Sequence, residues 1–146
     1  MSDAINQPSY YNRCGVAVID FIEDWDLNFS MGSFVKYICR AGKKDNYVQD
    51  LEKAKWYIKR FTERPIDPIL PEFGTYDWRE YAEAQHLENE LCMAMDIAFM
   101  ICQGDNVLLR LNDVLALIDI CISRYKRNET KNKVEHGVLE IGSENK

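Results

Sequence analysis

Apolar residues recur at helical spacing along almost the whole chain, and this periodicity constrains the fold more than any other feature. Between Tyr47 and Phe61 they follow a repeat of four and three residues, which is typical of a helix that packs on another helix. Similar patterns predict helices over residues 16–25, 30–41, 76–103 and 107–126. The sequence therefore predicts an all-α protein.

Three prolines interrupt this pattern near the middle of the chain. Pro65, Pro68 and Pro71 come at three-residue intervals, and proline cannot sustain a helix interior. We therefore expect a short N-terminal three-helix unit (residues 1–62) and a Pro-rich connector (63–75). A long antiparallel helical hairpin (76–127) and a flexible polar tail (128–146) follow, and at this length all four parts belong to one compact domain.

Both predicted helices of the hairpin are apolar most of the way round. Their apolar residues are Cys92, Met93, Met95, Ile97, Phe99, Met100 and Ile101 in the first, and Val107, Leu108, Leu109, Leu111, Val114, Leu115, Leu117, Ile118, Ile120 and Ile122 in the second. A helix of this kind is either central or shared with another subunit. Because 146 residues leave little room for two central helices, we expect a homo-oligomer. The alternative is a monomer whose N-terminal half wraps the hairpin.

Positive charge is concentrated in one short segment. Between Lys36 and Arg64 the chain has nine of its eighteen basic residues and only four acids, although its net charge is -6. An acidic chain with one basic segment is typical of a protein that binds a small anion at that segment, and not of one that binds a long nucleic acid.

The composition also excludes several classes of protein. Five widely spaced cysteines without a CxxC pair, and two distant histidines, disfavour a zinc site or a disulfide framework and suit a reducing cytosol. No apolar stretch approaches the roughly 18 residues of a membrane span, and we expect neither a secretory signal nor a membrane partner. A GxxxxGK[ST] motif is absent, so phosphate chemistry would use a non-P-loop architecture.

The basic segment is organised around a glycine turn. Lys36 and Arg40 lie four residues apart on one helical face, and Gly42 comes where a helix would end. We expect phosphoryl groups to bind at this basic corner, which we define as Lys36, Arg40, Lys43, Lys44 and Lys53. Arginine forks match phosphate oxygens and lysines supply point charge. The alternative is that these cations only complement the C-terminal end of the helix dipole.

Acidic and aromatic residues complete the predicted site. Carboxylates at Asp20, Glu23 and Asp50 could hold Mg²⁺ that bridges a nucleotide's phosphates, or could belong to solvated helix faces. Tyr11 and Tyr37 would line the base or ribose, or be ordinary core and rim residues.

Four segments of the N-terminal unit carry a family resemblance. They are Gln7-Pro8-Ser9-Tyr10-Tyr11, Gly15-Val16-Ala17-Val18-Ile19-Asp20-Phe21-Ile22, Phe29-Ser30-Met31-Gly32-Ser33-Phe34-Val35-Lys36-Tyr37-Ile38-Cys39-Arg40-Ala41-Gly42-Lys43-Lys44, and Asp50-Leu51-Glu52-Lys53-Ala54-Lys55-Trp56-Tyr57. Together they resemble a phage-encoded family of unknown function, related to the C-terminal part of a podophage non-P-loop nucleotide kinase. Tyr10 stands where that family has histidine, and Ser33 where it has asparagine.

The resemblance implies nucleotide binding in the cytoplasm of an infected bacterial host. If the protein is an enzyme, it implies phosphoryl transfer from a nucleoside triphosphate to a deoxynucleoside monophosphate. A second hypothesis is a non-catalytic phage protein that sequesters a nucleotide signal of host anti-phage defence. A third is an all-α nucleoside triphosphate pyrophosphatase, for which the chain has only partial metal motifs, Glu23 to Asp26 and Glu80 to Glu83.

Overall fold

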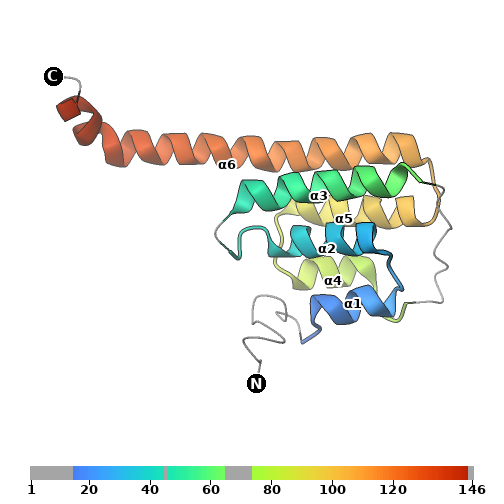
Figure 1. The fold of residues 1–146 in the computed structure, drawn as a ribbon. Helices are drawn as coiled ribbons and strands as arrows, with labels where there is room; N and C mark the ends of the chain where they lie inside the picture. Colours follow the sequence, from blue (N-terminus) through green and yellow to red (C-terminus); the bar gives the residue numbers. More distant parts are fainter. Residues whose placement is uncertain (1–14, 45, 65–73, 145–146) are drawn as a thin grey trace.

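The structure, a computed structural model, describes residues 15–44, 46–64 and 74–144, with side chains described up to residue 135. These residues form six helices and no strand, which confirms the all-α prediction (Figure 1). The helices are α1 (Val18–Asp24), α2 (Phe29–Arg40), α3 (Tyr47–Thr62), α4 (Trp78–Ala84), α5 (Asn89–Cys102) and α6 (Val107–Glu144).

The six helices repeat one three-helix arrangement twice. Helices α4, α5 and α6 each begin sixty residues after α1, α2 and α3. The turns agree as well, because a residue with left-handed φ follows the first helix of each unit, Asp26 at 50° and His86 at 58°. A glycine with positive φ follows the second helix of each unit, Gly42 at 85° and Gly104 at 80°. The sequence analysis did not predict this internal repeat.

The two units share their pattern of buried residues. Positions sixty residues apart are buried together, such as Val18 with Trp78, Met31 with Leu91, Ala54 with Val114, Ile58 with Ile118 and Phe61 with Cys121. In each unit the second and third helices pack as a hairpin, and α3 packs against α6 to join the units. Figure 1 shows the resulting layers, with α1 and α4 lowest, α2 and α5 between, and α3 and α6 uppermost.

Local signals explain where several helices begin. The Asn28 side chain accepts a hydrogen bond of 2.9 Å from the backbone N–H of Met31 and so caps α2. Asp77 caps α4 in the same way, through a 3.0 Å bond from the Glu80 N–H.

The prediction of a single helix over residues 76–103 is wrong. The chain turns between α4 and α5, and His86 takes the left-handed conformation there. This turn contains neither glycine nor proline, so no local turn signal marks it in the sequence. The predicted antiparallel hairpin is nevertheless present as α5 and α6.

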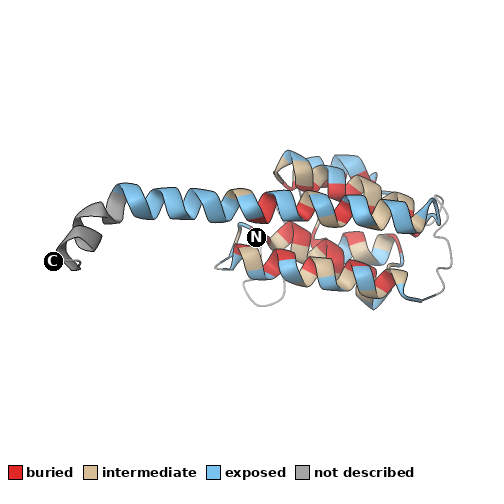
Figure 2. Cartoon of the chain, turned by 90° about the horizontal axis from the view of Figure 1, so that it is seen from above, coloured by how far each residue is buried: buried red, intermediate tan, exposed pale blue. Residues whose placement is uncertain are grey.

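The segment 128–146, which we expected to be a flexible polar tail, is helical as far as Glu144. Helix α6 is 38 residues long and continues to Glu144, well past the bundle, and its residues 126–135 are all exposed (Figure 2). No helix in the described ranges has the length and apolar character that crossing a bilayer requires. The predicted connector falls largely on residues 65–73, which lie outside the described residues.

Candidate functional site

The basic corner lies where α2 ends and α3 begins. Gly42 adopts a φ of 85° just after α2, as expected for a glycine turn. A Cβ atom at this position would lie 3.6 Å from the ring of Tyr47. Lys44 is exposed in the turn, and Lys43 is half-buried. The chain reversal brings the last turns of α2 beside the first turns of α3.

Asp50 is the buried centre of this corner. Its side chain is 1% exposed, and its Oδ2 lies 3.5 Å from the Nε of Arg40. Burial raises the pKa of Asp50, and the positive charges of Arg40, Lys53, Lys44 and Lys36 oppose that rise. Four cations from α2, α3 and the turn between them therefore surround a single carboxylate, so the corner keeps a positive excess.

Two of these lysines also meet an aromatic ring. The Nζ atoms of Lys36 and Lys53 lie 5.5 Å and 5.2 Å from the ring centre of Tyr37. Tyr37 stacks on Tyr57 with ring centres 5.8 Å apart and planes 9° from parallel. The structure thus brings together Lys36, Lys53 and Tyr37 as the sequence analysis expected, and adds Tyr57.

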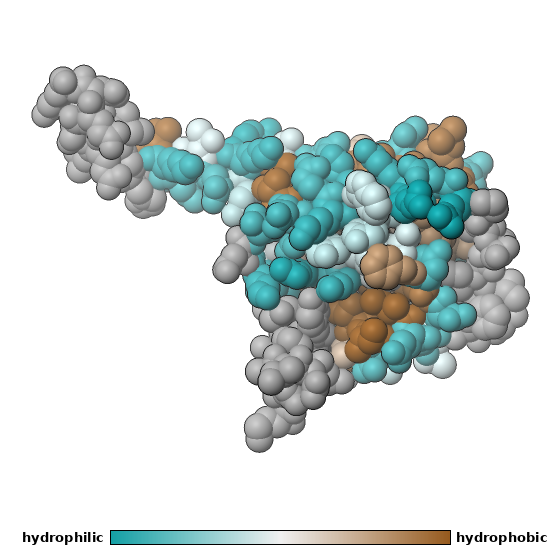
Figure 3. All heavy atoms as spheres, viewed as in Figure 1, coloured by the Kyte–Doolittle hydropathy of each residue, from teal (hydrophilic) through white to brown (hydrophobic). Residues whose placement is uncertain are grey.

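Tyr57 connects the corner to exposed aromatic surface. Phe29 and Trp56 both contact the Tyr57 ring edge-on, with ring centres 5.7 Å and 5.0 Å away. Phe29 is 78% exposed and Trp56 is 59% exposed. Figure 3 shows apolar side chains gathered where α1 and α2 lie in the view of Figure 1. We call Phe29, Tyr37, Trp56 and Tyr57 the aromatic cluster.

Sequence reasoning missed three of the four cluster residues, although a signal was present. Tyr57 follows Lys53 by four residues and therefore shares its helix face, as Arg40 shares that of Lys36. Trp25 belongs to the core, where its Nε1 donates a 2.7 Å hydrogen bond to the Tyr76 carbonyl. Tyr11 lies outside the described residues.

The second unit does not reproduce the corner. Asp96 and Asp113 occupy the positions that correspond to Lys36 and Lys53 in the first unit. Asp96 pairs with Arg79 at 2.7 Å. The repeat therefore separates a fold that both units share from a basic corner that, among the described residues, belongs to the first unit.

The proposed metal ligands do not form one group. Asp20 and Glu23 are exposed on α1, whereas Asp50 is buried beside Arg40. The clustered set of ligand atoms in the described chain, all within 4.8 Å of one another, belongs to Glu88, Glu90 and Cys121.

Arg124 already neutralises that set. Its guanidinium lies 2.8 Å from a carboxylate oxygen of Glu88 and 2.7 Å from one of Glu90. The hydrogen bond from Arg124 lowers the pKa of Glu90. Glu88 also accepts a hydrogen bond from the hydroxyl of Tyr47, and the Tyr47 ring stacks on Tyr125 at 4.5 Å. The network ties α3, α5 and α6 together, and we read it as structural.

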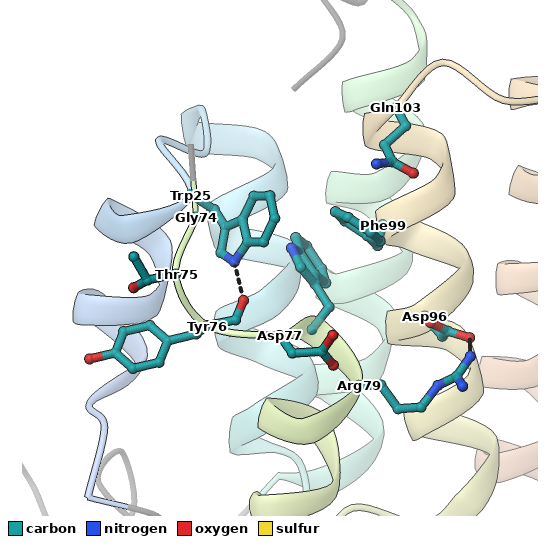
Figure 4. Close-up of a pocket in the computed structure, with 10 residues that line it drawn as sticks. Trp25, Gly74, Thr75, Tyr76, Asp77, Arg79, Asp96, Phe99 and Gln103 are labelled. Carbon is teal, nitrogen blue, oxygen red and sulfur yellow. Dashed lines mark hydrogen bonds and ion pairs between the residues drawn. The ribbon is translucent and has the colours of Figure 1, made fainter. Parts of the chain in front are cut away.

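A cavity of about 620 Å³ lies elsewhere, between the two units (Figure 4). Trp25, Trp78 and Phe99 give it aromatic walls, and none of the five residues of the basic corner lines it. Arg79 also lines the cavity, and its guanidinium already forms an ion pair with Asp96. We therefore place the candidate site at the basic corner and not in this cavity.

The fold and the corner together define an all-α protein of two three-helix units with a cationic glycine turn in the first. Residues 5–59 match a family model described as a protein of unknown function (DUF3310). This match confirms the predicted resemblance to a family of unknown function and covers α1, α2 and most of α3. No curated protein and no solved structure matches the chain. The relation to a podophage kinase stays a prediction.

Proposed function

We propose that this protein binds a nucleotide, with the phosphates at the basic corner and the base or ribose on the aromatic cluster. The observation that carries the proposal is the convergence of four cations on the single buried carboxylate of Asp50. Surplus positive charge at one corner of a chain whose net charge is -6 attracts an anionic ligand.

Stabilisation of cations by the helix dipole explains only part of the basic corner. Lys36 and Arg40 lie near the C-terminal end of α2, where cations are stabilised by the dipole. Lys53 lies in the N-terminal half of α3, where a cation gains nothing from that effect. Its Nζ nevertheless lies over the Tyr37 ring beside Lys36. A phosphate ligand gives these two lysines a shared role.

The aromatic cluster favours a nucleotide over simple phosphate. Stacking on an aromatic side chain is worth about 1–3 kcal/mol per base. Exposed rings of Phe29 and Trp56 adjoin the Tyr37–Tyr57 pair, which the lysines flank. One small ligand can therefore contact charge and ring together. In this proposal Asp50 holds Arg40 in place, and any Mg²⁺ arrives with the phosphates.

The proposal has two further parts. The first, supported by the family resemblance, is action in the cytoplasm of a phage-infected bacterium, by phosphoryl transfer to a deoxynucleoside monophosphate if turnover occurs. The second is self-association, because Met93, Leu108, Leu109 and Ile120 of the α5–α6 hairpin remain about half or more exposed. Apolar surface of this kind indicates an interface.

Binding and turnover are tested with the same preparation. Thermal unfolding is measured with ATP, with Mg²⁺-ATP and with each deoxynucleoside monophosphate, because a ligand of the native state raises the melting temperature. ADP release from Mg²⁺-ATP with one monophosphate would establish a kinase. A nucleotide retained through purification and released by heat, without turnover, would establish sequestration. The proposal is wrong if no nucleotide at millimolar concentration shifts the melting temperature.

A further inference from the structure

The outer face of α6 carries residues at coiled-coil spacing. Leu109, Ala116, Ile120 and Val134 are exposed and fall on the a and d positions of a single heptad frame. Leu109 is 62% exposed, Ile120 48% and Val134 53%. The opposite face of α6 packs on α3 and α5. We call the a and d positions of this frame the α6 seam.

Two seam positions carry opposite charges. Asp113 and Arg127 are both exposed, and neither makes an ion pair within the described part of the chain. In a parallel pair of α6 helices, each of these residues would face its own copy, and like charges would repel. An antiparallel pair removes this repulsion.

The α6 seam maps onto itself when one helix is reversed. In that register Leu109 faces Val134 of the second copy, and Ala116 faces Arg127 of the second copy. The methyl group of Ala116 leaves room for the longer arginine. Asp113 lies one helical turn before Ala116, within reach of the same guanidinium. The two-fold arrangement forms each of these contacts twice.

The protruding part of α6 gives an independent reason for a partner helix. Residues 126–135 are all exposed beyond the bundle, and an isolated helix of this size is marginal in water. Helix α6 forms the upper edge of the molecule in Figure 1, with no other element above it. An antiparallel partner would lay its own protruding segment along the start of this helix, over Leu109.

We infer that a second copy of this chain docks antiparallel along the α6 seam. This inference rests on the proposed self-association and names the surface responsible for it. It is independent of nucleotide binding, because the seam lies on the second unit and the basic corner on the first.

Disulfide trapping tests the register. Leu109→Cys and Val134→Cys proteins are purified separately, mixed and oxidised, and the linked peptides are mapped. The antiparallel dimer predicts a Leu109→Cys to Val134→Cys heterodimer. It predicts no Leu109→Cys homodimer, because those positions lie about 37 Å apart at 1.5 Å per residue. Homodimers without the heterodimer would overturn the antiparallel arrangement. Glu129→Cys, on the opposite side of α6 from Ile120, is the control and should not cross-link to either.

Charge reversal tests the contacts in solution. Light scattering should give about twice the chain mass of 17.1 kDa. Asp113→Arg and Arg127→Asp should each raise the dimer dissociation constant by about tenfold or more, and the double variant should restore it. Lys133→Asp, exposed on α6 but off the seam, should change it little. A monomeric wild type would refute self-association itself. A dimer indifferent to both charge reversals would place the interface elsewhere.

Discussion

Phe21 and Tyr81 stack at the junction of the two units, with ring centres 4.1 Å apart and planes 11° from parallel. They are equivalent residues of the internal repeat, each on the first helix of its unit. Both are buried, and Phe21 also meets Trp78 edge-on at 5.1 Å. The same position of the repeat therefore contributes twice to the contact between the units.

Removing this ring should destabilise both units together. Phe21→Ala should lower the free energy of unfolding by about 3–5 kcal/mol, the cost of deleting a buried phenyl group and leaving a cavity. Phe21→Leu should cost clearly less. Urea unfolding followed by circular dichroism and by tryptophan fluorescence should give coincident transitions. Two separated transitions in the wild type would show that the units fold independently.

The sequence could predict the helices but not the repeat that organises them. Helix periodicity placed α2, α3 and α6 because their buried faces are regular, and Gly42 marked a turn by its chemistry. Equivalent positions of the two units are buried alike, but most of them carry different residues. Leu51 with Leu111 and Ile58 with Ile118 are among the few identical pairs. Burial is a tertiary property, so one sequence did not reveal the duplication.

The sequence alone predicted the basic residues of the candidate site better than its aromatic residues. Lys36 and Arg40 share a helix face by spacing alone, and the turn at Gly42 brings Lys53 toward them. The role of Asp50 depends on its being buried against Arg40, which spacing does not tell. Phe29 meets Tyr57 across two helices, a contact that only the packing of α2 on α3 creates.

Asp50→Asn should leave stability at pH 7 nearly unchanged, within about 1 kcal/mol. Burial raises the pKa of Asp50, so its ionised form is disfavoured in the folded protein, and a neutral isostere avoids that cost. The wild type should therefore gain stability from this group as the pH falls through the raised folded pKa. This gain levels off below the ordinary pKa of 3.8. The Asn variant should lack this gain in urea titrations.

The same variant should bind nucleotide more tightly, by about fivefold. Removing one negative charge about 4 Å from a bound phosphate oxygen is worth about 1 kcal/mol at the dielectric constant of water, which applies to a ligand open to solvent. Isothermal titration with the best nucleotide ligand measures the change. A loss of affinity beyond tenfold would mean that Asp50 contacts a ligand-borne metal, or that its hold on Arg40 outweighs its charge.

Asp24 fastens the end of α1 to the start of the second unit. Its carboxylate accepts hydrogen bonds from the Thr75 N–H and hydroxyl, both at 2.8 Å, and from the Tyr76 N–H at 3.1 Å. Asp24→Ala should lower the free energy of unfolding by about 1–3 kcal/mol. Burial alone would raise the pKa of Asp24, but the bonds from Tyr76 and Thr75 outweigh it and lower the pKa.

The stabilisation that the Asp24 carboxylate provides should depend on pH. Because the folded pKa is depressed, the contribution is fully present above the ordinary pKa of 3.8 and is lost as the pH falls through the lower folded value. The stability difference between wild type and Asp24→Ala should therefore shrink below about pH 4. A difference that stays constant down to pH 2 would argue against the charged hydrogen bonds.

Cys102 and Cys121 should be inert thiols in the folded protein. Burial raises the pKa of Cys102 to about 12 and, with the nearby Glu88 and Glu90 carboxylates, that of Cys121 to about 11. Thiolate is the reactive form, so alkylation at pH 8 should label neither residue until the protein unfolds. Peptide mapping after a timed iodoacetamide pulse reports each cysteine separately. Rapid labelling of Cys102 in native buffer would contradict the packing of α5.

Nucleotide titration of two charge-matched double variants tests the central claim most directly. Lys36→Glu/Lys53→Glu alters the pair of lysines over Tyr37, whereas Lys59→Glu/Lys133→Glu makes the same change in net charge at exposed positions. With both variants folded by circular dichroism, the first should weaken nucleotide binding by about 100-fold or more. The second should stay within about threefold of wild type, the small loss expected from distant, screened charges. Equal affinities of the two variants would contradict the assignment of the phosphate site to the basic corner.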